Sequence, residues 1–216
     1  MACRSCVPMV TAMGLRSDHA GVSTVVVVEG PSDQLAIEAL AERRGIDLAA
    51  VGVRVVRLGG AHRIGTFLDE LGRTRDGLRL AGLCDAGEEP VFRRALERAR
   101  FGCDLTRARM EQLGFYVCVE DLEDELIRAL GAATVEEIVR ANGDIRRFRA
   151  LQQMPAWRGA ATEAQLGRFM GSGAGRKIRY ARFLIDALDH ESVPRPLDRV
   201  LVHAVEVAAN EPDVAL

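Results

Sequence analysis

Lysine is nearly absent from this 216-residue chain: Lys177 is the single lysine among 29 lysine and arginine residues. Arginine replaces lysine well as a surface charge, but poorly where a compact ammonium group is required. Every other one of these basic residues is arginine, so the single lysine is informative. We therefore treat Lys177 as a candidate functional residue.

Long apolar runs are also missing. No segment approaches the roughly 18 apolar residues that a membrane-spanning helix needs, and the N-terminus lacks the charged start and apolar core of a signal peptide. The five cysteines are an odd number without regular spacing, and the four histidines show no zinc-binding spacing. These absences predict a cytoplasmic protein with reduced thiols, no disulfide framework, no zinc site and no membrane contact.

Charge is unevenly distributed, although the net charge is only −2. Residues 140–182 contain ten basic residues and two acidic ones, whereas the charged residues within 120–137 are all acidic apart from Arg128. A basic stretch near an acidic cluster is typical of phosphate and metal binding, respectively. The alternative for the basic stretch is a solvated, arginine-rich helical surface.

The hydrophobic pattern alternates between short apolar runs and amphipathic segments. It predicts strands over 24–28, 51–58, 78–84 and 114–119, and helices over 32–44, 62–71, 88–98 and 122–130. Such alternation is typical of βαβ units and a parallel sheet. After Gly131 only helices are predicted, over 135–141, 145–153, 163–170, 177–188 and 195–209. We expect a loose leader (1–21), an α/β core of about four strands (22–131) and a helical extension (132–216).

Two carboxylates flank the turn that ends the first strand. Glu29 follows the run Val25–Val28, and Asp33 lies in the first turn of the next helix. Ligands bind at the carboxyl ends of strands in open α/β sheets. The pattern indicates a metal site, while the simpler alternative is a turn with helix-starting residues.

The arrangement of strand, Glu-Gly-x-Ser-Asp and helix, followed by a strand that ends in Leu83-Cys84-Asp85-Ala86-Gly87, resembles the TOPRIM domain of topoisomerases, primases and related nucleases. In that family, a glutamate after the first strand and an acidic pair after the third bind divalent metal. Glu29 and Asp85 match two of these positions. Gly87 stands where the family often has a second aspartate, so the resemblance implies an incomplete acidic pair.

Further features resemble the overcoming-lysogenization-defect (OLD) family of nucleases. They are Asp33 after Glu29, the pair Gly59-Gly60 after the second strand, the acidic segment 121–127, and Gly175-Arg176-Lys177-Ile178-Arg179. The resemblance runs from about Val25 to Leu188 and implies Glu123 as another metal ligand and Lys177 as the catalytic lysine. Arg176 and Arg179 would contact phosphate. The ATPase domain of that family is not found in this sequence, so we expect a stand-alone TOPRIM domain.

Carboxylates crowded at one edge repel one another and raise each other's pKa values unless a cation is bound. Mg²⁺ or Mn²⁺ suits such oxygen ligands. Two ions about 3.5–4 Å apart can activate water and stabilise the leaving oxygen of a phosphodiester, and a lysine can neutralise charge on the phosphate. We predict two ions bound by Glu29, Asp33, Asp85 and Glu123.

Several features have structural alternatives. Asp121, Asp124 and Glu125 also suit the first turn of a helix. Trp157 could stack on a base or anchor the helical extension. The glycine-rich segment 171–177 lacks the preceding strand and the Ser or Thr of a phosphate-binding loop.

The sequence thus predicts a metal-dependent endonuclease that nicks or cleaves DNA, with Glu29 and Lys177 as catalytic residues. The alternative is a non-catalytic nucleic-acid-binding or assembly module that works with a separately encoded ATPase. Primase-like nucleotidyl transfer ranks last, because no nucleotide-binding element is visible. The oligomeric state, monomer or homodimer, is left open.

Overall fold

The computed structural model describes residues 21–74, 78–173 and 175–209, and its centre is a four-stranded parallel sheet. The strands are β1 (Thr24–Val28), β2 (Val53–Arg57), β3 (Arg79–Cys84) and β4 (Phe115–Val117), in the order β2-β1-β3-β4. β1 pairs with β2 and β3, and β3 pairs with β4. The predicted fold class is confirmed: a parallel sheet is flanked by helices and followed by further helices.

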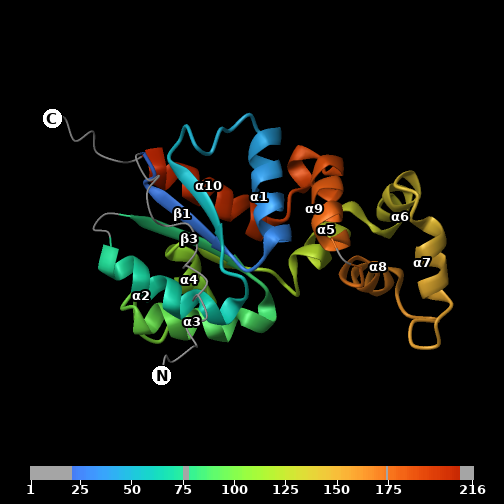
Figure 1. Cartoon of the computed structure of the whole chain (residues 1–216), viewed down its shortest axis with the longest axis horizontal. Helices are drawn as coiled ribbons and strands as arrows, with labels where there is room; N and C mark the ends of the chain where they lie inside the picture. Colours follow the sequence, from blue (N-terminus) through green and yellow to red (C-terminus); the bar gives the residue numbers. More distant parts are fainter. Residues whose placement is uncertain (1–20, 75–77, 174, 210–216) are drawn as a thin grey trace, which may run out of the picture.

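Helices cover both faces of the sheet because alternate residues of each strand point to opposite sides. Val26 and Val28 belong to one hydrophobic cluster, which includes residues of α1 (Pro31–Arg43), α9 (Arg176–Ala187) and α10 (Arg195–Ala209). Val25 and Val27 belong to the other, with α2 (Ile64–Thr74), α3 (Glu89–Arg98) and α4 (Arg107–Gln112). Figure 1 shows the two layers on either side of the strands. A sheet covered on both faces explains the uninterrupted apolar run of β1.

The predicted elements agree closely with the structure. Strand 24–28 and helices 122–130 (α5, Leu122–Leu130) and 195–209 are found with the predicted bounds. Helix 62–71 is instead a short 3-10 turn, Ala61–Arg63, that continues into α2. The short helix α4 was not predicted, although the side chain of Thr106 caps it by accepting a hydrogen bond from the backbone N–H of Arg109 (3.3 Å).

The helices after Gly131 divide into two groups in space. α6 (Ala132–Ala141), α7 (Ile145–Gln152) and α8 (Thr162–Gly171) stand apart from the sheet, at the right of Figure 1. α9 returns to pack against α1 and α5, and α10 packs on the strands. The domain division at Gly131 stays a prediction, but α9 and α10 share the core of the α/β layers. The predicted leader lies almost wholly outside the described residues.

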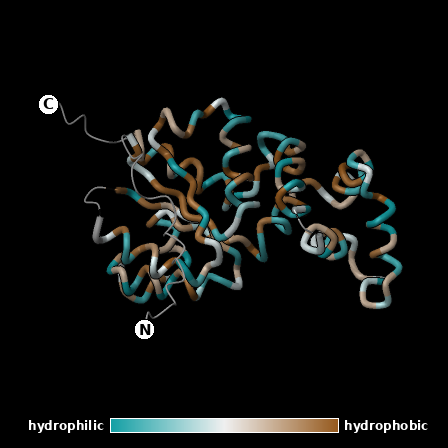
Figure 2. The backbone as a smooth tube through the Cα atoms, viewed as in Figure 1, coloured by the Kyte–Doolittle hydropathy of each residue, from teal (hydrophilic) through white to brown (hydrophobic). Residues whose placement is uncertain are grey.

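Hydropathy follows this arrangement. The strands and the inward faces of the helices are brown in Figure 2, whereas the outer turns are teal. Among the described residues, no helix is long and apolar enough to cross a membrane.

The close contact of β3 with its neighbours depends on Gly82. A Cβ atom at Gly82 would lie 2.6 Å from a ring carbon of buried Phe115 and 3.0 Å from a methyl carbon of Val27. We predict that Gly82→Ala lowers the free energy of unfolding by about 1–3 kcal/mol through overpacking. Urea denaturation would measure this change.

Gly72, inside α2, is the matched control, because an added Cβ there meets nothing within 4 Å. Gly72→Ala should raise the free energy of unfolding by about 0.5–1 kcal/mol, since alanine favours the helix. Equal stability of the two variants would contradict the packing described for β3.

Candidate functional site

The carboxyl ends of the strands bring Glu29 and Asp85 together. Glu29 directly follows β1 and Asp85 directly follows β3, and these two strands are adjacent in the sheet. The backbone N–H of Asp85 donates to Oε1 of Glu29 (3.2 Å). The next residue, Ala86, donates its N–H to the carbonyl of Glu120 (2.9 Å), which joins this loop to the segment after β4. Three loops are thus connected at one edge.

Asp33 lies beside this edge in the first turn of α1. Its Oδ2 accepts a hydrogen bond from the backbone N–H of Gly30 (2.9 Å), and Ser32 lies at hydrogen-bond distance from Oδ1 (3.5 Å). Asp33 therefore does cap the start of α1, which is the simpler alternative considered for it from the sequence. Asp33 is 8% exposed, so its charge is held largely away from water, near Glu29.

Glu123 of α5 faces Lys177 of α9 across the helix interface. Nζ of Lys177 lies 2.9 Å from Oε2 of Glu123, whose side chain is 5% exposed. Oε1 of Glu123 is buried and has no hydrogen-bond partner among the described residues. A buried polar atom normally has a partner, so this oxygen marks a place where a ligand would be stabilised.

The other acids of this segment serve the start of α5. Asp121 accepts from the backbone N–H of Asp124 (2.8 Å), and Glu125 accepts from that of Val119 (2.8 Å). Asp124 and Glu125 also pair with Arg128. Glu125 is buried as well, but its oxygens bind Val119 and Arg128, whereas Glu123 pairs with Lys177 and keeps one oxygen without a partner among the described residues.

The electrostatics of the site are those of uncompensated negative charge. Burial, together with Glu29 and Asp33, raises the pKa of Asp85 to about 7, although Lys177 lowers it. Burial likewise raises the pKa of Glu123 to about 7 against the opposing effect of Lys177. Burial raises the pKa values of Glu29 and Asp33 as well. Burial lowers the pKa of Lys177, but Glu123, Asp33 and Asp85 outweigh it and raise that pKa well above its usual range.

The chemistry of these donors fits a hard divalent cation. All are carboxylate oxygens, and Lys177 offsets their negative charge only in part. One buried oxygen of Glu123 also lacks a partner in the part of the chain that the structure describes. Across the described ranges, however, no three His, Cys, Asp or Glu side chains are arranged to hold a metal ion as they stand. Metal binding would therefore require these side chains to move together.

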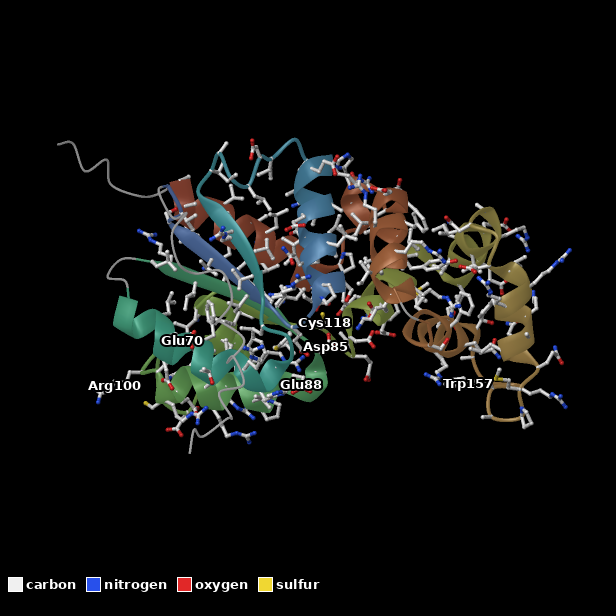
Figure 3. All side chains as sticks on the ribbon, viewed as in Figure 1. Glu70, Asp85, Glu88, Arg100, Cys118 and Trp157 are labelled. Atoms are coloured by element: carbon white, nitrogen blue, oxygen red, sulfur yellow. The ribbon has the colours of Figure 1, made fainter. Side chains whose placement is uncertain are left out.

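The loop after Asp85 contains the predicted deviation at Gly87. Gly87 lies in a 3-10 turn, Ala86–Glu88, and a Cβ atom added there would meet nothing within 4 Å. Glu88 follows, and its charge raises the pKa of Glu29. Figure 3 labels Asp85 and Glu88 at this end of the sheet. Glu88 was not predicted as a site residue from the sequence. Its position three residues after Asp85, in the loop that follows β3, could have indicated that it lies near the site.

Arg176 and Arg179 do not join the acidic edge. Arg176 donates to the carbonyl of Phe169 (2.8 Å) and lies over its ring. Arg179 pairs with Asp144, a buried residue that also accepts from Arg147 and Tyr180. Both arginines thus support the junction of α7, α8 and α9, and their predicted phosphate contacts remain a prediction.

Trp157 lies in the part of the chain that stands apart from the sheet (Figure 3). It is half-buried and packs against the larger hydrophobic cluster, and its carbonyl accepts from the side chain of Gln165 (2.8 Å). These contacts favour the anchoring role.

The raised pKa values predict a pH dependence of stability without added metal. The folded state holds the protons of Asp85 and Glu123 more tightly than the unfolded chain does. This contribution is full below the ordinary carboxyl range and is lost as the pH rises through about 7. The free energy of unfolding in EDTA should therefore be lower at pH 8 than at pH 5, as measured by urea denaturation.

Asp85→Asn should reduce this pH dependence, whereas Asp124→Asn, which changes an acid paired with Arg128 on the surface of α5, should leave it unchanged. Stability that rises with pH in both the wild type and Asp85→Asn would refute this electrostatic description.

Residues 22–75 match the family model described as overcoming lysogenization defect protein-like, TOPRIM domain. A search of curated proteins gives no match. The fold is similar to the C-terminal region of the Xanthomonas campestris pv. campestris OLD protein, with 25% identity, a TM-score of 0.67, and coverage of 87% of this chain and 94% of that one.

The C-terminal region of the Burkholderia pseudomallei OLD protein has the same fold, with 19% identity, a TM-score of 0.61, and coverage of 87% of this chain and 98% of that one. The resemblance found from the sequence motifs is confirmed.

Proposed function

We propose that this chain, which is similar to the OLD-like TOPRIM domain, a nuclease-type domain, hydrolyses DNA phosphodiester bonds in a reaction that depends on a divalent metal. Nicking or cleavage within a strand is the reaction that we expect. Mg²⁺ or Mn²⁺ would be held by Glu29, Asp33, Asp85 and Glu123.

One observation carries the proposal. Carboxylates from three segments far apart in the sequence, at positions 29–33, 85 and 123, lie at one edge together with the single lysine of the chain. Their burial and mutual repulsion oppose the charged state. A fold that needed only stability would gain more from apolar residues at these positions. The presence of these buried charges therefore supports a binding role.

The residues of the chain have distinct tasks in such a reaction. A bound divalent ion would supply Lewis acidity and lower the pKa of water. Glu29 and Asp85, coupled through the backbone of Asp85, would hold one another in place at the strand ends. Nζ of Lys177, partly exposed beside Glu123, would donate to a phosphate oxygen and offset the negative charge that develops there.

A second candidate function has two observations in its favour. The described side chains include no preformed group of three metal ligands, and Gly87 stands where the family often has a second aspartate. In this alternative, the chain binds nucleic acid without cutting it and acts with a separately encoded ATPase. Calorimetry distinguishes the two candidates, because only the nuclease requires Mg²⁺ or Mn²⁺ to bind. Salt-sensitive DNA binding without metal binding would favour the alternative.

We predict that Glu29→Gln abolishes nicking of supercoiled plasmid in Mg²⁺ or Mn²⁺, with a loss of at least about 100-fold, because metal and water lose their anchor. Lys177→Ala should reduce nicking by about 100-fold or more through loss of charge stabilisation. Gel electrophoresis across Mg²⁺, Mn²⁺ and Ca²⁺ gives the rates. Glu89→Gln is the control, since Glu89 pairs with Arg107 on the surface. Full nicking by Glu29→Gln would refute the mechanism.

Gly87→Asp tests the deviation from the family pattern. The site has room for the side chain, so the free energy of unfolding at pH 5 should change by less than about 1 kcal/mol. The added carboxylate should tighten Mn²⁺ binding by about tenfold in calorimetry, because another oxygen ligand is available. Unchanged or weaker Mn²⁺ binding would show that position 87 does not face the metal.

A further inference from the structure

The loop after β2 lies against the residue that carries the first carboxylate. Leu58 N–H donates to the carbonyl of Val28 (2.8 Å), and the N–H groups of Gly59 and Gly60 both donate to the carbonyl of Glu29 (3.0 and 3.2 Å). The loop is thus bound directly to the backbone of the site. Its position is set by hydrogen bonds to Glu29 and not by side-chain packing alone.

The two glycines are required by this path. Gly59 has φ +75° and Gly60 has φ +121°, a region that favours glycine. They turn the chain into the 3-10 turn Ala61–Arg63, in which Ala61 is buried whereas His62 and Arg63 are exposed.

Both exposed side chains fold back over the glycines. A Cβ atom at Gly60 would lie 3.0 Å from Cε1 of His62, and one at Gly59 would lie 3.4 Å from Nη1 of Arg63. The guanidinium and imidazole groups therefore lie close to the two glycines whose N–H groups bind the carbonyl of Glu29, in the loop at the carboxyl end of β2.

Arg63 differs from the paired cations near this edge. Lys177 pairs with Glu123, Arg107 pairs with Glu89, and Arg128 pairs with Asp124 and Glu125. Arg176 and Arg179 are occupied by Phe169 and Asp144. Within the described residues, Arg63 makes no ion pair and no side-chain hydrogen bond, so its guanidinium is free for an external anion.

The strand order places this free cation opposite Lys177. The loop follows β2, the first strand of the order, whereas Glu123 and its partner Lys177 belong to the side of α5, which follows β4. Glu29 and Asp85 lie between them. A DNA strand that reaches the acidic edge would be repelled by the carboxylates unless cations also contact its phosphates on either side.

From this geometry we infer that Arg63, assisted by His62, binds a backbone phosphate of DNA that flanks the phosphodiester at the acidic edge. The inference rests on the proposed function, because it takes DNA as the substrate. It assigns to the loop after β2 a contact that the sequence suggested for Arg176 and Arg179. Such a contact positions the strand and carries no base specificity.

The test is the salt dependence of DNA binding in Ca²⁺, measured by fluorescence anisotropy with a short labelled duplex. Arg63→Ala should weaken binding by about three- to tenfold and lower the slope of log K against log salt by about 0.9, the value for one lost phosphate contact. Arg63→Lys should retain the slope. The double variant His62→Ala/Arg63→Ala should weaken binding further.

Arg146→Ala is the matched control, because Arg146 is an exposed arginine of α7, in the part that stands apart from the sheet. Its slope should equal that of the wild type. A wild-type slope for Arg63→Ala, in a protein that binds and nicks DNA, would overturn this inference alone. Absence of DNA binding by the wild type would overturn the proposed function as well.

Discussion

The ion pair between Lys177 and Glu123 is the interaction on which the arrangement of the site depends. A buried carboxylate without a partner is costly, and removing one member of such a pair leaves the other uncompensated. Lys177 comes from α9 and Glu123 from α5, so the pair holds the returning helix to the segment that follows the sheet. α9 also packs along α1, which carries Asp33. The pair therefore links the elements that hold the acidic side chains.

The later helices explain how this single lysine reaches the sheet. α6, α7 and α8 lead the chain away, and the buried Asp144, bound by Arg147, Arg179 and Tyr180, connects α7 to α9. The arginine-rich segment suggested a phosphate-binding surface from composition alone. In the structure, some of its arginines instead hold α7, α8 and α9 together. Its cations stabilise the helices, while the acidic edge keeps a net negative charge.

The strand ends and their carboxylates were predictable from the sequence for a physical reason. The run Val25–Val28 can be satisfied only by burial on both faces, and a parallel sheet provides that burial. The positions of Glu29 and Asp85 then follow from where the apolar runs stop, whereas Glu123 was singled out among its acidic neighbours only by the resemblance to the OLD family. Helix α4 was missed because its six residues are too short to show a period, and the contacts of Arg176 and Arg179 depend on Phe169 and Asp144, which no local pattern relates to them.

By itself, the sequence determined the order of the elements, the parallel sheet and the identity of the acids at its carboxyl edge, because burial and periodicity act over neighbouring residues. Only the tertiary structure decided which charges are paired and which are free. Glu123 has one oxygen on Lys177 and one that finds no partner in the described part of the chain. Arg179 is bound to Asp144, and Arg63 is open to solvent. Pairing joins residues that are distant along the chain, so it is set by how the helices pack and not by spacing.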